Sequence, residues 1–169
     1  PSRQVTRDPD RTQDDIVLPH SPLVAKEEAE RLLSEARGGR VLVVGDAMLD
    51  VYLTGSVDRV SPEAPVPVVR VESEVAAPGG AANVAAGVAA LGGECRLVAA
   101  VGADESAGRL AERLDHAGVG SDELILMAGR PTTRKTRILA RHQQMLRVDH
   151  EDPAPMAEED HRRLASRAL

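Results

Sequence analysis

The stretch APGGAANVAAGVAALGG, residues 77–93, decides the fold class. Its adjacent glycines, Gly79 and Gly80, let the backbone approach another group closely, and small apolar residues then recur at helical spacing. The pattern predicts a tight turn that leads directly into a helix. Asn83 falls in the first turn of this helix, where its amide offers both a hydrogen-bond donor and an acceptor. We expect a small polar ligand here; the alternative is that Asn83 is a local helix cap.

The segments around this turn alternate between strand and helix patterns. The apolar runs RVLVVGD (40–46) and CRLVAAVG (95–102) predict buried parallel strands, and ELILM (123–127) predicts a short strand. Apolar residues at helical spacing predict helices at 106–117 and from residue 158. The alternation indicates an α/β fold with a mostly parallel sheet and helices on both sides.

Two other segments predict strands at an edge or a surface. In SPEAPVPVVRVES (61–73) valine alternates with proline, which cannot donate to a strand ladder, so this is an edge strand or a lid strand. RKTRILARHQQMLRVDHE (134–151) predicts two strands around a turn near His142 and Gln143. Strand alternation would then place Lys135, Arg137 and Arg141 together on the side away from the core.

The N-terminal part of the chain differs in composition from the rest. Residues 1–20 are polar and lack apolar periodicity, which predicts a disordered tail. Residues 21–39 contain alanine and leucine at helical spacing before Gly38 and Gly39, which predicts a leading helix. The remaining residues, 40–169, are enough for one domain with a hydrophobic core.

Composition excludes several classes of partner. The net charge of −6 gives a field that repels nucleic acid. The sequence has no apolar run long enough to span a membrane and no signal peptide at its start, so we expect a cytoplasmic protein without a membrane partner. Cys95 is the only cysteine, and we assign it a buried position without chemistry.

Two common phosphate-binding motifs are absent from the sequence. It has no Gly-Lys pair, which a P-loop requires, and the first apolar run continues as GDAMLD instead of a glycine-rich dinucleotide motif. The carboxylates Asp46 and Asp50, expected at the carboxyl end of that strand, suit sugar hydroxyls, because a carboxylate can accept two hydrogen bonds from a diol. Alternatively, both aspartates only cap or form turns.

Four blocks in order, VVGDAMLD, SPEAPVPVV, PGGAANVA and RHQQMLRVD, carry a family resemblance. Residues 40–169 resemble the ribokinase-like (PfkB) carbohydrate kinases, and among these the bacterial kinases of D-glycero-D-manno-heptose 7-phosphate. The resemblance implies transfer of the γ-phosphate of ATP, with Mg²⁺, to the anomeric hydroxyl of this phosphorylated sugar, a step of nucleotide-activated heptose biosynthesis. It places the sugar pocket at Asp50, Gly79, Gly80 and Asn83, beneath a small β lid that includes SPEAPVPVV. A homodimer formed through this lid is also compatible with the family.

One departure from the family affects catalysis. The Gly-Ala-Gly-Asp segment that carries the family's general base and anion hole does not occur in these residues. Phosphoryl transfer depends on such charge stabilisation, so we expect the N-terminal, sugar-side part of a kinase domain, incomplete at its C-terminus and inactive alone.

The substrate's phosphate needs a separate binding group. Lys135, Arg137 and Arg141 suit it as cations on an acidic protein, the alternative being a solvated strand face. A kinase for another sugar or a nucleoside, and a truncated non-catalytic binding module, remain alternatives to the heptose kinase.

Overall fold

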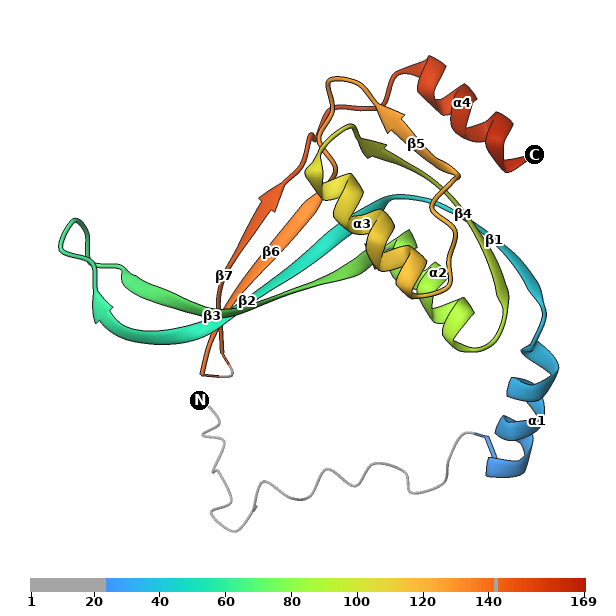
Figure 1. Ribbon diagram of the computed structural model, residues 1–169, viewed down its shortest axis with the longest axis horizontal. Coiled ribbons are helices and arrows are strands. Elements are labelled where there is room, and N and C mark those ends of the chain that lie inside the picture. Colours follow the sequence, from blue (N-terminus) through green and yellow to red (C-terminus); the bar gives the residue numbers. More distant parts are fainter. Residues whose placement is uncertain (1–23, 142) are drawn as a thin grey trace, which may run out of the picture. The chain divides into compact units, whose positions relative to one another are not determined.

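The computed structural model describes residues 24–141 and 143–169 (Figure 1). The tail predicted for residues 1–20 and the turn residue His142 lie outside the described residues. The described residues fall into two units, one that ends at Glu35 and one that comprises Ala36–Leu169. The predicted leading helix is present as α1 (Lys26–Ala36), in which Arg31 forms ion pairs of 2.6 Å with Glu28 and Glu35.

A parallel sheet of three strands, in the order β1-β4-β5, forms the first layer of the second unit. The strands are β1 (Arg40–Val44), β4 (Glu94–Gly102) and β5 (Leu124–Met127), at the positions that the apolar runs predicted. Leu97 and Val98 of β4 are almost completely buried. The prediction that the first run is buried is wrong, because β1 is an outer strand of this sheet and its Leu42 and Val44 are exposed.

A second sheet of four strands has the order β3-β2-β6-β7. The long strands β2 (Ala47–Val60) and β3 (Pro67–Gly80) are antiparallel, β6 (Arg134–Ala140) is parallel to β2, and β7 (Gln143–His150) is antiparallel to β6. The proline-rich segment therefore does lead into an outer strand, β3, which begins at Pro67. The parallel arrangement of the first layer does not extend through this mixed sheet.

Helices cover both faces of β4, as predicted. On one face, Leu97 and Ala99 join a buried cluster with α2 (Ala81–Ala90) and α3 (Glu105–His116). Strand alternation turns Arg96 to the other face, where it donates a hydrogen bond of 2.5 Å to the backbone oxygen of Arg167 in α4 (Glu158–Ala168). None of the helices described here is long and apolar enough to cross a membrane.

Strand β2 connects the core to the exterior. Its residues Leu49 and Val51 are buried in the cluster with α2 and α3, whereas Met48, Asp50 and Tyr52 alternate with them and lie on the opposite face of the sheet. A set of polar side chains from neighbouring strands gathers on this opposite face, which we call the charged face: Asp50, Lys135, Arg137, Arg147 and Asp149.

Candidate functional site

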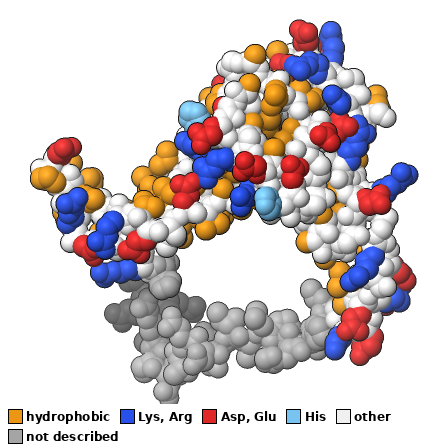
Figure 2. Space-filling model, in the orientation of Figure 1, with side chains coloured by type: hydrophobic (Ala, Val, Ile, Leu, Met, Phe, Trp, Pro, Cys, Tyr) orange, Lys and Arg blue, Asp and Glu red, His pale blue; other side chains and the backbone are white. Residues whose placement is uncertain are grey.

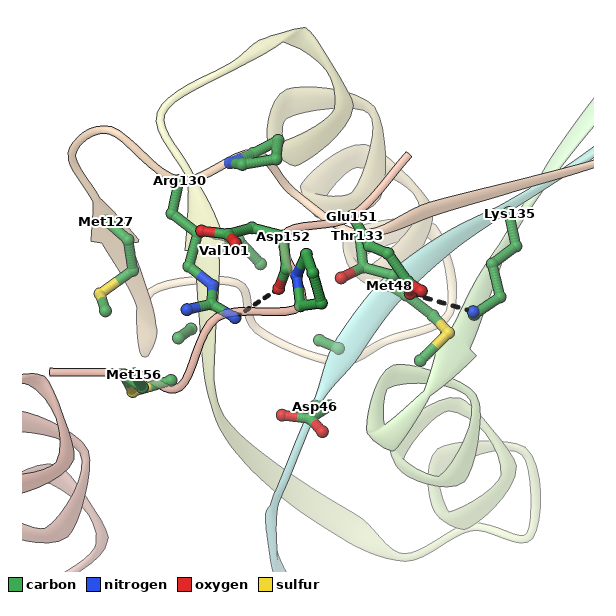
Figure 3. A pocket seen from close by; sticks show the side chains of 14 residues that line it. Asp46, Met48, Val101, Met127, Arg130, Thr133, Lys135, Glu151, Asp152 and Met156 are labelled. Atoms are coloured by element: carbon green, nitrogen blue, oxygen red, sulfur yellow. Dashed lines mark hydrogen bonds and ion pairs between the residues drawn. The ribbon is translucent and has the colours of Figure 1, made fainter. Parts of the chain in front are cut away.

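A pocket of about 270 Å³ lies where the parallel strands end and where β2 and β6 begin (Figure 3). Asp46 enters it between β1 and β2, Val101 from β4, and Met127 from the end of β5. The carboxyl ends of parallel strands are the usual position of ligand sites in open α/β sheets. The remaining polar lining residues are Arg130, Thr133, Lys135, Glu151 and Asp152, and Met48 and Met156 add apolar surface.

The cations of the pocket already have oxygen partners. The Lys135 ammonium lies 3.2 Å from Glu151 and 3.3 Å from Asp149, and these hydrogen bonds raise the pKa of Lys135 above its ordinary value. Arg130 donates a hydrogen bond of 2.8 Å to the backbone oxygen of Asp152 (Figure 3). Donors and acceptors therefore stand side by side, an arrangement that suits a ligand with many hydroxyl groups.

Asp50 lies next to this pocket on the charged face. The Nη1 atom of Arg137 is 2.5 Å from Oδ1 of Asp50, and the same guanidinium lies 5.3 Å from the centre of the Tyr52 ring. The hydrogen bond with Asp50 raises the pKa of Arg137. Asp50 was expected at the end of the strand formed by residues 40–46, but the chain turns at Gly45 and Asp50 lies inside the next strand, β2.

The Gly79-Gly80 pair makes room for the two aspartates. A Cβ atom on Gly79 would stand 2.7 Å from Oδ2 of Asp50 and 2.8 Å from Cγ of Met48. Gly80 has a φ of 57° and faces the Asp46 carbonyl, which accepts a hydrogen bond of 2.9 Å from the backbone N–H of Ala81. The groups that the glycine pair approaches are Asp46, Met48 and Asp50 of the chain itself; approach to a ligand stays a prediction.

Asp104 fixes the loop that brings Arg130 and Thr133 to the pocket. Its Oδ1 accepts a hydrogen bond of 3.0 Å from Ala107 as the cap of α3, and its Oδ2 accepts one of 2.8 Å from the backbone of Thr132. Thr132 is buried, and its hydroxyl oxygen accepts a hydrogen bond of 2.9 Å from Gly102. Burial raises the pKa of Asp104, but the hydrogen bonds outweigh it and hold this pKa below its ordinary value.

Comparison with known proteins decides the family. Residues 39–167 match the model of the pfkB family of carbohydrate kinases. The chain belongs to this family. It is 55% identical over 119 residues to the bifunctional protein HldE of Halorhodospira halophila, covering 70% of the chain and 25% of that protein. It is 41% identical over 140 residues to the HldE of Pelobacter propionicus, covering 83% of the chain and 29% of that protein.

A solved structure supports the fold assignment of this pfkB chain. A protein assigned as a ribokinase from Agrobacterium tumefaciens superposes with a TM-score of 0.54 at 27% sequence identity, over 73% of the chain and 41% of that protein. The ribokinase-like α/β fold predicted from the sequence is thus confirmed. The pfkB chain spans between a quarter and a third of the length of its curated relatives.

Asn83 lies where the sequence predicted, in the first turn of α2 in this pfkB chain. The alternative role as a helix cap is not realised: Gly80 is the residue at the cap position, and no side chain caps α2. Asn83 is exposed and stands three residues beyond Gly80. Its amide is therefore accessible beside the glycine turn.

The three predicted cations do not form one group in the pfkB chain. Lys135 lines the pocket, Arg137 binds Asp50, and Arg141 lies beyond the end of β6 with a φ of 48°. Because a strand rises about 3.3 Å per residue, Arg141 lies roughly 20 Å from Lys135, too far for one phosphate to contact both. In the view of Figure 2, cationic and anionic side chains lie interspersed rather than in a patch of one sign.

Within residues 24–141 and 143–169 of the pfkB chain, no three His, Cys, Asp or Glu side chains gather as metal ligands would.

Sequence reasoning missed several functional candidates. Arg130, Thr133, Glu151 and Asp152 reach the pocket from loops, where apolar periodicity gives no information. The position of Asp104 was predictable from the sequence, because an aspartate directly before a helical pattern is a preferred helix cap.

Proposed function

We propose that the chain forms the sugar-binding side of an ATP-dependent kinase that phosphorylates the anomeric hydroxyl of D-glycero-D-manno-heptose 7-phosphate. Membership of the pfkB family and 55% identity to a protein named HldE support this assignment. The activity is proposed for the whole protein, because the chain spans only part of the length of its relatives. ATP, with Mg²⁺ bound to its phosphates, would supply the transferred group.

The observation that carries the proposal is the Asp50 carboxylate beside Gly79. Oδ1 of Asp50 binds Arg137, while Oδ2 lies on the side where Gly79 has no side chain. A carboxylate held in this way can accept hydrogen bonds from adjacent sugar hydroxyls. Asn83 next to the turn would contribute a donor and an acceptor, and Asp46 would contribute a second carboxylate from within the pocket.

The phosphate of the substrate is assigned to Lys135. Among the three predicted cations, this residue lines the pocket. It would exchange one of its carboxylate partners for the substrate phosphate, to which it can form a charge-assisted hydrogen bond. Arg141 is too far from the pocket to share this phosphate, and the role of Arg137 is treated below.

We also propose a homodimer through the exposed part of the four-stranded sheet. Val71 and Val75 of β3, the outer strand that follows the proline-rich lid segment, each expose about half or more of their surface. Exposed apolar side chains on outer strands favour a protein partner, and the proposed partner is a second copy of the chain. The acidic net charge argues against nucleic acid, and a cytoplasmic location fits a kinase that consumes ATP.

Calorimetric titration of the 169-residue chain tests the sugar site. Heptose 7-phosphate should bind, and Asp50→Asn and Asn83→Ala should each weaken it by about tenfold or more, because each removes a hydrogen bond to a hydroxyl. Asp58→Asn is the matched control, since this carboxylate lies on the same strand and is paired with Arg70 at 3.3 Å. Sugar affinity unchanged by both site variants would contradict the proposal.

The same titration separates the alternatives. Tighter binding of ribose, fructose 6-phosphate or adenosine would indicate another substrate within the family. Phosphoryl transfer is to be measured on the product of the complete reading frame, where we expect heptose-dependent ADP release. The 169 residues alone should bind the sugar without turnover. Binding without turnover in the complete product would favour a non-catalytic module.

A further inference from the structure

We infer that Arg137 is the positioning residue of the sugar site, which holds the Asp50 carboxylate in the orientation that sugar hydroxyls need. The inference rests on the proposed function and adds a residue that acts through Asp50 without touching the sugar. It replaces the phosphate-binding role expected for Arg137 from the sequence.

The neighbours of Arg137 fix the direction of its side chain. In the sheet register, Arg137 lies opposite Arg147 of β7 on one side and Tyr52 of β2 on the other. Like charges directly opposite each other on a sheet repel, so the guanidinium is favoured on the β2 side. There it bonds Asp50 at 2.5 Å and lies over the Tyr52 ring at 5.3 Å, while Arg147 pairs with Asp149 at 2.8 Å.

The Arg137–Asp50 pair is buried enough that loss of either partner should change the orientation of the other. The Arg137 and Asp50 side chains retain 23% and 17% of their exposure. Loss of one partner from such a pair leaves the other charge poorly solvated and free to reorient. By contrast, Arg70 and Asp58, a second arginine–aspartate pair on the same sheet, are 72% and 57% exposed. Exposed pairs of this kind contribute little.

The two carboxylate oxygens of Asp50 have different neighbours, which connects the Arg137–Asp50 pair with the candidate site. Arg137 takes Oδ1, and Oδ2 is the oxygen that a Cβ atom on Gly79 would crowd at 2.7 Å. Arg137 therefore holds one oxygen and directs the other toward the glycine turn. A residue that positions Asp50 affects every ligand that uses Asp50, whether or not the ligand carries a phosphate.

The test compares two sugars on the 169-residue chain by calorimetry: D-glycero-D-manno-heptose 7-phosphate and the same heptose without phosphate. Arg137→Gln should weaken both by about tenfold, the effect of losing a well-placed charged hydrogen-bond partner. Arg137→Lys, which keeps the charge, should restore binding to within about threefold of wild type. In an Asp50→Asn background, Arg137→Gln should cause no further loss, because the two residues act as one unit. Arg70→Gln should leave both affinities unchanged.

Several outcomes would overturn the inference. A loss confined to the phosphorylated sugar would make Arg137 a phosphate ligand, and additive losses in the double variant would show that it does not act through Asp50. Failure of Arg137→Lys to restore binding would also contradict the positioning role. If Arg137→Gln does not fold, Arg137→Met, which keeps a long unbranched side chain without the charge, takes its place with the same expected loss.

One result would contradict the proposed function without deciding the role of Arg137. If wild type binds neither heptose, the proposed substrate is wrong, and thermal unfolding without ligand then decides whether Arg137 holds Asp50. A double variant that melts at the temperature of the less stable single variant supports the coupling. A double variant whose melting temperature falls by the sum of both single effects overturns it.

Discussion

Strand β4 of the parallel sheet is covered on both faces, whereas strand β7 of the four-stranded sheet is exposed along its whole length. Leu97 and Val98 of β4 are almost completely inaccessible, and the corresponding central residues of β7, Leu146 and Arg147, are open to solvent. Strand β4 packs into an apolar cluster that it shares with the inner face of β2, whereas the charged face on the other side of the four-stranded sheet carries ion pairs. The candidate site lies at the border between the apolar cluster and the charged face. Asp46 follows the end of β1, and Asp50 lies on β2.

The largest expected effect is on the apolar side of this comparison. Leu110→Ala in α3 removes a completely buried side chain from the core and should cost about 2–5 kcal/mol of unfolding free energy. Leu146→Ala, at a position 56% exposed on β7, should change it by less than about 0.5 kcal/mol. Urea unfolding of both variants measures the difference. Equal losses would show that the outer strand β7 depends on apolar packing as much as the shared core does.

A substitution at the boundary should separate binding from stability. Gly79→Ala places a methyl group 2.7 Å from Oδ2 of Asp50 and 2.8 Å from Cγ of Met48. Both side chains can rotate away, so the fold should tolerate the change while Asp50 is displaced. Heptose 7-phosphate should bind about tenfold more weakly by calorimetry, with little change in melting temperature. Gly87→Ala in α2 is the control, because a Cβ atom there meets nothing within 4 Å. A Gly79→Ala protein with wild-type affinity would argue against the assigned site.

Asp104 caps α3 and binds the loop that lines the pocket. Its removal should have a smaller, pH-dependent effect on the free energy of unfolding. Asp104→Ala should cost about 1 kcal/mol at neutral pH, measured by urea unfolding, because it removes the cap of α3 and the bond to Thr132. The folded state lowers the pKa of Asp104, so its contribution is present above the unfolded pKa of about 4 and is lost as the pH falls through the folded value. The difference between wild type and variant should therefore shrink at low pH. A difference that grows on acidification would contradict this sign.

The smallest expected effect belongs to an exposed ion-pair network. Glu123 lies 3.3 Å from Arg96 and 2.8 Å from Arg167 and so connects the parallel sheet to α4. Glu123→Gln should cost less than about 0.5 kcal/mol, because exposed pairs are weak. Hydrogen exchange of the α4 amides is the sensitive measurement, and it should accelerate in α4 without changing in α3. Global destabilisation would show that α4 contributes more to the core than its exposure indicates.

The fold was predictable where local patterns dominate. Apolar runs located β1, β4 and β5, and glycine pairs with helical spacing located α2, because these signals lie within a few residues of each other. Burial of β1 was not predictable from its own residues, since it depends on which strands and helices become its neighbours. The long strand β2 was missed as well, although Leu49, Val51 and Leu53 alternate with Asp50 and Tyr52 within it.

The candidate site was predictable in its residue types and less so in its contacts. Asp46 and Lys135 line one pocket, and Asp50, Gly79 and Gly80 lie together as expected. The pairing of Arg137 with Asp50 joins two residues far apart in the sequence, and no spacing rule indicates such a contact. Strand alternation placed Lys135 and Arg137 on one face but could not show that each meets a carboxylate there.

The parallel pairing of β2 with β6 also sets an order of events during folding. Asp50 and Arg137 are 87 residues apart, so their contact closes a long loop, and its entropy cost must be met before the contact contributes. The hairpins β2–β3 and β6–β7 join neighbouring segments and can form early, whereas the pairing between them is slow by virtue of its sequence separation. During synthesis on the ribosome, β2 cannot pair with β6 until residues 134–140 have been made, so the candidate site is completed only after the core around α2 and α3 has been synthesised.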